Sequence, residues 1–516
     1  MKAFLMYHDR DFDMQSGLPQ NEPALTQDLE LNTLFNAMAG DDKFLFEVAR
    51  WALLSGLDND PETILYRQNV LKDCLKNAAI VREMHRIAVE AIENEKKNYW
   101  SYLSRHPNIV LHRSVEVLQM FVTLLKKLRK IADDHASQFE SEGFAAFFTM
   151  LRKELDDDYF VIVEHHLAEL KFRSGVLISA ELEKGNKGGR YLLRKNPDEK
   201  HHWVRRLFAQ KAPAYTFHLH PRDEAGAQAL SELTNRGINR VANALAQSTD
   251  HVLSFFNLLR IESGFYVSCV NLHEELAATA APLCFPLPAE AGKLRHSFTG
   301  LYDICLALTL KQKVVGNDVN ANGRNLMLIT GANRGGKSTF LRSIGLSQLM
   351  MQAGMFVPAE SFSANVCDHL FTHYKREEDV TMKSGKFDEE LSRMNDIADH
   401  VTSHSMLLFN ESFAATNERE GSEISRQITR ALLEKHVKIF FVTHLYEFAH
   451  SFVGSPMGNV IFLRAERRTD GRRTFKLIEG EPLQTSYGED LYRTIFDDYE
   501  ETASRAAPAR TALTTE

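Results

Sequence analysis

The chain has 516 residues, of which 44% are hydrophobic and 25% are charged, and this composition is that of a folded protein and not of a disordered or fibrous one. At roughly 150 residues per domain, this length predicts two to four domains. The 61 lysines and arginines and the 69 aspartates and glutamates give a net charge of −8, which excludes a uniformly basic surface and restricts any nucleic-acid site to a local patch.

The amino terminus does not have the pattern of a signal peptide. Charged residues occur at Asp9 and Arg10, before an apolar run reaches signal length, and no later segment approaches the ~18 uncharged apolar residues that a membrane-spanning helix needs. The five cysteines are scattered and include no Cys-x-x-Cys pair, which favours a reduced chain without structural zinc. We therefore expect a cytoplasmic protein and treat residues 1–24 as an N-terminal extension.

The pattern from about residue 25 to residue 295 is helical. In two long stretches without proline or glycine, apolar residues recur at steps of three, four or seven positions, so that they share one face of a helix. These residues are Val117, Phe121, Leu124, Leu128 and Ile131 in the first stretch, and Val241, Leu245, Val252, Phe256 and Leu259 in the second. Such stripes predict the core of a helical domain.

Residues 171–222 interrupt this helical region with a short basic segment. It holds twelve basic and four acidic residues, a local balance of +8, and Tyr191, Trp203 and Tyr215 are interleaved with the cations. Two interpretations stay open: a clamp-like surface that contacts phosphates and bases, or a solvated hairpin or helical pair. The candidates for contact with DNA are Lys187, Arg190, Arg194, Lys195, Arg205 and Arg206.

From residue 296 to residue 495, short apolar runs alternate with amphipathic helical patterns. The runs at 325–330, 405–409 and 438–442 are bounded by polar residues or glycine, which is typical of buried strands in a parallel α/β sheet. The last residues, 496–516, are small and polar and predict a disordered tail.

The first of these strands runs into a loop that satisfies the pattern G-x-x-x-x-G-K-[ST] at every fixed position. Its backbone N–H groups and the following helix predict a phosphate site, in which Lys337 contacts the β- and γ-phosphates and Ser338 ligates Mg²⁺. The residues expected to bind ATP are Gly331, Ala332, Asn333, Arg334, Gly335, Gly336, Lys337, Ser338 and Thr339.

The second and third strands end in residues that suit hydrolysis. Glu411 follows the second strand and is placed as a general base, together with Lys337 in the catalytic set. Asn410 precedes it where an aspartate is usual, so it can orient the metal shell without supplying charge, and we expect weak metal affinity or slow turnover. His444 ends the third strand, where it can sense the γ-phosphate.

These residues resemble the ATPase and core of MutS-type DNA mismatch-repair proteins. The similarity is dense between Asn317 and Tyr374, and weaker similarity extends over most of the chain. The matching segments are 317–320, 328–342, 354–360, 387–391, 416–421, 443–444 and 486–488, with fainter similarity at 28–31, 66–68 and 244–259. The resemblance implies an α plus α/β multidomain fold, in which a helical core and lever region (25–295) precedes an ABC-like P-loop NTPase domain with a mostly parallel sheet (296–495).

The chain also departs from the pattern of this family. The core-like pattern begins near Asp28, so the mismatch-recognition and connector domains of the family do not fit here, and the loop at 412–417 lacks its Gly-Arg-Gly. Val314 stands where members place an aromatic residue against adenine. At the signature loop, which in the family reaches the nucleotide of a partner subunit, Ser384 and Lys386 are the candidate residues; Lys386 is a trans-acting cation or a solvated lysine.

The resemblance implies a dimeric ATPase that uses ATP and Mg²⁺ to change the grip of helical arms on double-stranded DNA that is mismatched, branched or otherwise distorted, with repair proteins as further partners. The alternative is a nucleotide-gated protein-interaction module with little or no hydrolysis, which Asn410 favours. An ATPase acting on small molecules ranks last, because no additional catalytic constellation accompanies the loop.

Overall fold

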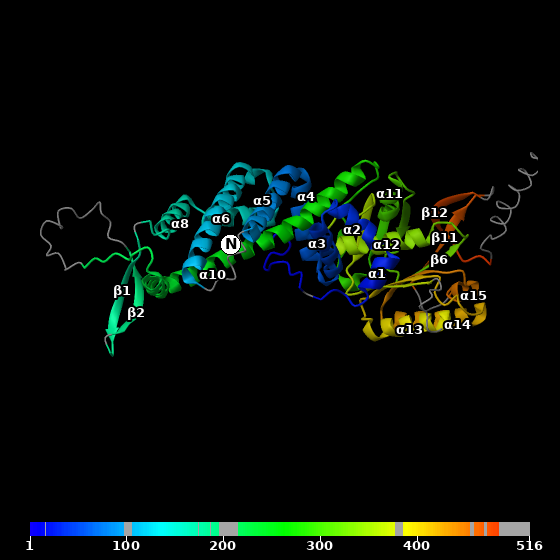
Figure 1. Cartoon of the computed structure of the whole chain (residues 1–516). Coiled ribbons are helices and arrows are strands. Elements are labelled where there is room, and N and C mark those ends of the chain that lie inside the picture. The colour runs from blue at the N-terminus through cyan, green and yellow to red at the C-terminus, as the bar shows by residue number, and fades with distance from the viewer. Residues whose placement is uncertain are drawn as a thin grey trace, which may run out of the picture. The chain divides into compact units, whose positions relative to one another are not determined.

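Two units make up the described part of the chain (Figure 1). The computed structural model describes residues 1–15, 17–97, 106–173, 175–185, 187–195, 215–376, 385–454, 459–468 and 472–484. The helical unit comprises residues 1–5, 9–12 and 77–264, and the sheet unit comprises residues 6–8, 13–76 and those from 265 onward. Within the described ranges, no helix is long and apolar enough to cross a membrane.

The helical unit is built on the two stripes of apolar residues that the sequence predicted. Phe121 and Phe256 are fully buried, and their ring centroids lie 5.4 Å apart. Its helices are α5 (Ala78–Lys97), α6 (Pro107–His135), η3 (Ala136–Gln138), α7 (Glu142–Glu154), α8 (Asp157–Glu169) and the first part of α10 (Glu224–Ala277). The predicted helical core around these stripes is confirmed, and α10 continues into the sheet unit beyond residue 264.

An antiparallel hairpin of β1 (Leu177–Glu183) and β2 (Lys187–Arg194) also belongs to the helical unit. It lies by the N-terminal end of α10 in Figure 1, where the backbone of Gly237 closely approaches the side chain of Ile178. A Cβ at position 237 would lie 2.4 Å from Ile178 Cδ1. Most side chains of the hairpin are exposed, so the hairpin offers its charges to solvent.

The first helices of the chain belong to the sheet unit, although the sequence analysis grouped residues 25–76 with the helical region. Arg67 explains their place: it is fully buried, and its guanidinium donates to the carbonyl oxygens of Met6 (2.9 Å) and Ala353 (3.4 Å). Ala353 ends the helix that follows the phosphate loop, where carbonyl groups need partners. These helices are α1 (Glu22–Asp28), α2 (Leu31–Ala39), α3 (Lys43–Leu54), η1 (Ser55–Asp58) and α4 (Pro61–Lys76).

A six-stranded sheet forms the centre of the sheet unit, in the order β12-β11-β6-β10-β9-β8. All neighbours are parallel except β11 and β12. The strands are β6 (Leu326–Gly331), β8 (Leu370–Tyr374), β9 (Met406–Asn410), β10 (Lys438–Val442), β11 (Val460–Arg467) and β12 (Arg473–Glu479). The three predicted strands are β6, β9 and β10, which confirms a mixed α/β domain.

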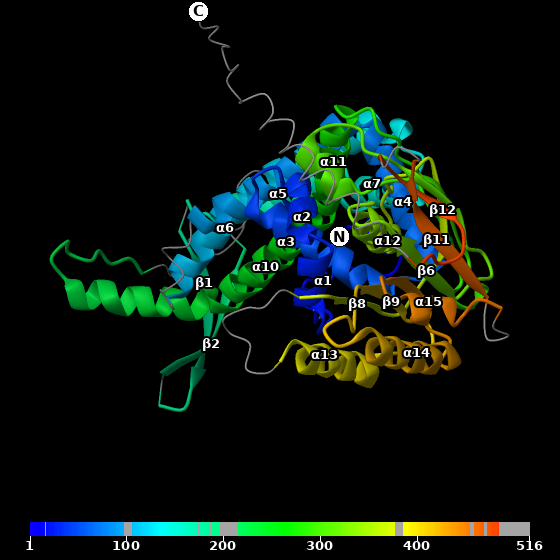
Figure 2. The same ribbon diagram turned by 90° about the vertical axis from the view of Figure 1, so that its right-hand side faces the viewer.

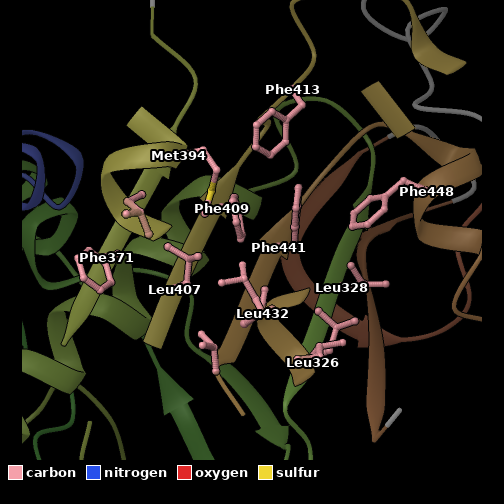
Figure 3. Close-up of a cluster of buried hydrophobic side chains, with 14 of the residues drawn as sticks. Leu326, Leu328, Phe371, Met394, Leu407, Phe409, Phe413, Leu432, Phe441 and Phe448 are labelled. Carbon is pink, nitrogen blue, oxygen red and sulfur yellow. The ribbon is translucent and has the colours of Figure 1, made fainter. Parts of the chain in front are cut away.

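Helices cover both faces of this sheet (Figure 2). Leu408 faces α12 (Lys337–Gln352), since a Cβ at Gly345 of that helix would lie 2.8 Å from the Leu408 side chain. Its neighbours Leu407 and Phe409 point to the opposite face, because side chains alternate along a strand. There they join a buried apolar cluster with side chains of α13 (Lys386–His400) and α14 (Glu418–Glu434) (Figure 3).

A smaller four-stranded sheet lies beside α12 in the sheet unit. Its order is β3-β7-β4-β5, and Asn317 of β5 joins it to β12 of the large sheet. The side-chain oxygen of Asn317 accepts from the Leu477 amide at 2.7 Å, and its amide group donates to the Phe475 carbonyl at 3.4 Å. The remaining elements are β3 (Leu287–Ala289), η4 (Ala291–Lys293), β4 (His296–Leu301), α11 (Ile304–Leu310), β5 (Asn317–Asn320), β7 (Ser361–Asn365) and α15 (Tyr446–His450).

Candidate active site

The three parallel strands β6, β10 and β9 bring the predicted site residues to one edge of the sheet. β10 lies between the other two, and Val442 pairs with Ile329 of β6 and with Asn410 of β9. Because the strands are in register and parallel, their carboxyl ends meet at the same edge, where ligands bind in open α/β sheets. The loops that follow these strands therefore carry the candidate chemistry.

The loop after β6 needs its glycines for two different reasons. Gly331 (φ +107°) and Gly336 (φ +87°) have backbone conformations that other residues rarely adopt. At Gly335 the limit is space, since a Cβ would lie 2.6 Å from the Cβ of Ala465 in the neighbouring strand β11. The loop can therefore turn sharply and point its backbone N–H groups toward an anion at the start of α12.

Lys337 lies beneath this loop. Its side chain is buried, and its Nζ donates to the carbonyl oxygens of Gly331 (3.1 Å) and Ala332 (3.0 Å). Burial lowers the pKa of Lys337 to about 8, while the nearby carboxylate of Glu411 acts in the opposite direction. An ammonium group has three donors, so with two of them on the loop a charged Lys337 can donate the third to an anion.

Ser338 and Asn410 meet across the site. The Ser338 hydroxyl donates to the side-chain oxygen of Asn410 at 2.9 Å, so two oxygen ligands from α12 and β9 converge on one place. Oxygen ligands of this kind suit Mg²⁺. The amide of Asn410 brings no negative charge, so the pair would attract a cation less strongly than a serine with an aspartate.

Glu411 is held by His444 at the end of the third strand. Nε2 of His444 lies 2.9 Å from Oε1 of Glu411, and the Glu411 amide donates to the Val442 carbonyl at 2.9 Å. This hydrogen bond from His444 is the largest cause that lowers the pKa of Glu411, and Lys337 adds to it. The carboxylate is therefore ionised at neutral pH and can accept a proton.

A cavity of about 550 Å³ opens beside the loop. The loop residues from Asn333 to Thr339 line one side of it together with Glu411, and Tyr302, Val314 and Phe475 line it elsewhere. Phe475 is half exposed and has a left-handed backbone (φ +60°). Sequence reasoning missed Phe475, because an aromatic residue in an ordinary strand far from the loop carries no signal; only the pairing of β12 with β11 brings it here.

The two residues predicted to act in trans cannot be treated alike. Ser384 lies outside the described residues. Lys386 is the first residue of α13, is half-buried, and is not among the residues that line the cavity of its own chain. A role in trans therefore stays a prediction.

The candidate DNA-binding residues divide in the same way, since Arg205 and Arg206 lie outside the described residues. The other four lie on or just after β2 and are exposed. Arg190 pairs with Glu181 at 3.2 Å, and Lys195 pairs with Glu169 at 3.1 Å. The remaining two are Lys187 and Arg194, and Arg194 donates to the hydroxyl of Ser179 at 2.9 Å. Exposed ion pairs of this kind are weak, so all four cations remain available to phosphates.

Two family models match separate parts of this chain. The model described as the MutS2 N-terminal domain matches residues 59–279, and the model described as MutS domain V matches residues 327–496. The second match contains the phosphate loop, Glu411 and His444, and the first contains the basic hairpin.

Curated relatives match the chain in part. MutS protein homolog 4 of Mus musculus is 32% identical over 151 residues, which are 29% of this chain and 16% of that protein. DNA mismatch repair protein MutS of Lactobacillus acidophilus is 30% identical over 223 residues (40% of this chain, 26% of that protein), and Endonuclease MutS2 of Thermus thermophilus is 33% identical over 161 residues (31% and 22%). The chain spans at most 26% of the length of these three relatives.

Proposed function

Because this chain belongs to the MutS-type family of mismatch-repair ATPases, we propose that it is an ATP-dependent DNA-binding protein whose sheet unit binds and hydrolyses ATP. One observation carries this proposal above the others. The contacts between Ser338 and Asn410 and between Glu411 and His444 converge around Lys337, at the edge of the cavity. A phosphate grip, a cation site and a base are thereby assembled in one place.

The residues of the cavity fit a nucleoside triphosphate. The backbone N–H groups of the loop and the positive end of α12 suit the phosphates, and Lys337 is placed to exchange its loop carbonyls for phosphate oxygens. Phe475 and Val314 offer apolar surface to the base. Ser338 and Asn410 would hold Mg²⁺, which when bound neutralises charge on the phosphates.

In hydrolysis Glu411 takes the proton of the attacking water. His444 keeps the carboxylate in one orientation and favours its ionised form, which raises the fraction of enzyme ready to act. We also propose that His444 senses the γ-phosphate. Asn410 leaves the cation site short of one negative charge, so we expect slow turnover compared with a site that has an aspartate there.

The proposed partner of the helical unit is double-stranded DNA, mismatched, branched or otherwise distorted. The exposed cations of β2 would contact its phosphates, which position a protein without reading sequence. We also propose a dimer in which Ser384 and Lys386 approach the nucleotide of the second subunit. The helical arms would then change their grip when ATP binds. A cytoplasmic location completes this proposal.

ATP turnover with and without duplex DNA tests the proposed function. We expect DNA-stimulated hydrolysis in the unaltered chain, loss of turnover in Lys337→Ala, and a fall of roughly 10²-fold or more in kcat in Glu411→Gln with ATP binding retained. Lys435→Ala, which removes an exposed lysine after α14, is the matched control and leaves turnover unchanged. Turnover that survives in Lys337→Ala would contradict the assignment of the loop.

A second candidate function is a nucleotide-gated module that binds a protein partner and hydrolyses little. The replacement of the expected aspartate by Asn410 favours it, because the pair with Ser338 is then uncharged on both sides. Tight ATP binding without turnover, with or without DNA, would select this function over the first.

A further inference from the structure

The short segment that follows β9 has an unusual backbone. Glu411 (φ +55°) and Phe413 (φ +61°) both have left-handed conformations, although neither is a glycine. Such conformations persist only where surrounding contacts hold them, and they concentrate at functional sites. The contacts that hold this segment therefore determine where the Glu411 carboxylate points.

His373 of β8 provides one of these contacts. Its ring is buried, with Nδ1 at 2.8 Å from the Ser412 hydroxyl and Nε2 at 2.9 Å from the backbone carbonyl of Glu390 in α13. A carbonyl oxygen only accepts, so Nε2 carries a proton. Burial lowers the pKa of His373 to about 4, so the ring is neutral at physiological pH. The Ser412 hydroxyl therefore shares its proton between the unprotonated Nδ1 and the backbone carbonyl of His373, which lies at 2.5 Å.

Glu390 provides the second contact. Its side chain is buried, which raises the pKa of its carboxyl group, while the backbone N–H of Phe413 interacts with this group and lowers its pKa by a smaller amount. The ring of Phe413 in turn stacks on His373, with centroids 5.1 Å apart and planes at 21°. Figure 3 shows Phe413 near Phe409 and on the same side of the sheet as Met394 of α13. The backbone and the ring of Phe413 and the hydroxyl of Ser412 are thus all held by contacts with β8 and α13.

We propose that His373 and Glu390 are positioning residues for Glu411, which tie the orientation of its carboxylate to the position of α13. This inference rests on the proposed role of Glu411 in hydrolysis. Because both contacts reach α13, whose first residue is Lys386, a displacement of this helix changes the hydrolysis rate and leaves the phosphate loop untouched. We call these contacts of His373 and Glu390 with the Glu411 segment the relay. The relay thus controls the rate of hydrolysis separately from ATP affinity.

Variants that keep the volume of each side chain separate positioning from packing. His373→Phe removes both hydrogen bonds and keeps an aromatic ring for Phe413 to stack on. Glu390→Leu removes the acceptor, whereas Glu390→Gln keeps an acceptor oxygen for the Phe413 amide. We expect single-turnover hydrolysis to fall roughly 10- to 100-fold in His373→Phe and Glu390→Leu, with ATP affinity within about twofold of the unaltered chain and nearly full activity in Glu390→Gln.

His369→Phe is the matched control. His369 adjoins the opposite end of β8, and its ring also stacks on a phenylalanine, Phe371, at 5.8 Å. Replacing it removes an exposed histidine of the same strand region, away from the Glu411 segment, so hydrolysis stays unchanged. If thermal melting shows that His373→Phe has lost its fold, Ser412→Ala tests the same attachment, because it removes the hydroxyl that contacts both Nδ1 and the backbone carbonyl of His373.

The pH profile distinguishes positioning from a general structural defect. The titratable groups that face Glu411 are His444, Lys337 of α12 and Lys375 after β8, and all three lower its pKa, the hydrogen bond from His444 most of all. A carboxylate that turns away from His444 has a higher pKa, so the acid limb of the kcat profile moves to higher pH in His373→Phe. A variant that only folds less well loses amplitude and keeps the limb in place.

Amide hydrogen exchange tests the relay without any turnover. In the full-length chain without nucleotide, we expect the Phe413 amide to exchange slowly, and at least tenfold faster in His373→Phe but not in His369→Phe. Unchanged exchange, or unchanged single-turnover hydrolysis, would overturn the proposal. If the unaltered chain does not hydrolyse ATP, the proposed function fails, while the exchange of Phe413 alone still decides whether the relay holds the segment.

Discussion

The phosphate edge of the sheet and the β1–β2 hairpin are both rich in candidate functional residues, yet they are built in opposite ways. At the sheet edge Lys337 is buried, and each important polar group has a named partner from another strand or helix. On the hairpin the cations are exposed, and Arg190, together with Lys195 just after the hairpin, forms a weak ion pair with a nearby acid.

This difference indicates how each region responds to change. Polar groups interact strongly and act as a unit where the dielectric constant is low and the register of the strands fixes their positions. One substitution there therefore has a large effect on activity. Exposed cations contribute small, separable amounts that depend on salt. The function of the sheet edge thus depends on the exact positions of its side chains, whereas that of the hairpin depends on its charge.

The largest effect that would sharpen this contrast is the pH dependence of ATP binding. In the free chain burial lowers the pKa of Lys337 to about 8. Below that pH the amine is charged and suits a triphosphate; above it, binding must take up a proton, so ATP affinity falls by about tenfold per pH unit. Isothermal titration between pH 7.5 and pH 9.5 measures this slope, and Lys337→Arg, which stays charged, flattens it. If the ATP affinity of the unaltered chain does not change with pH over this range, the contrast between the sheet edge and the hairpin fails.

A smaller effect is expected at the cation site. Asn410→Asp supplies the missing charge opposite Ser338, so we expect the Mg²⁺ concentration for half-maximal turnover to fall about three- to tenfold. Turnover measured across a Mg²⁺ series checks this expectation. Asn325→Asp, at the opposite end of the parallel strands just before β6, is the matched control. If both variants respond alike, a local cation site at Asn410 is refuted.

The smallest effects belong to the hairpin. Replacing Lys187 and Arg194 by glutamine should weaken DNA binding a few-fold and reduce the slope of log affinity against log salt by roughly 0.9 per residue that contacts a phosphate. Fluorescence anisotropy at several salt concentrations measures the slope. Lys435→Gln in the sheet unit keeps the slope of the unaltered chain, and a double variant with that same slope would remove the hairpin from the DNA-binding surface.

The sequence was sufficient for those parts of the site that depend on short-range spacing. A glycine-rich loop between an apolar run and a helix predicts a phosphate site, and Glu411 and His444 directly follow two other apolar runs. Because parallel strands place their carboxyl ends together, the contact between Glu411 and His444 could be anticipated before any coordinates.

Parts of the site that depend on long-range packing could not be predicted. Phe475 reaches the cavity only because β12 pairs with β11. In the sequence, His373 has no feature that distinguishes it from other strand residues. Its contact with Glu390 arises from the packing of α13 on β8. Similarly, the helices before residue 76 have an ordinary amphipathic pattern, and nothing in that pattern states which core they join; the buried Arg67 decides it.

The sheet unit is discontinuous in sequence, since its residues 13–76 and those from 265 onward are separated by residues 77–264 of the helical unit. During synthesis on the ribosome, the early helices emerge long before β6 and α12 exist, and Arg67 has no carbonyl of Ala353 to bind. Closing so long a loop is costly in entropy and slow. In nascent chains the intervening helices can therefore fold while the first helices still expose their apolar surface. A chaperone would bind the chain at this stage.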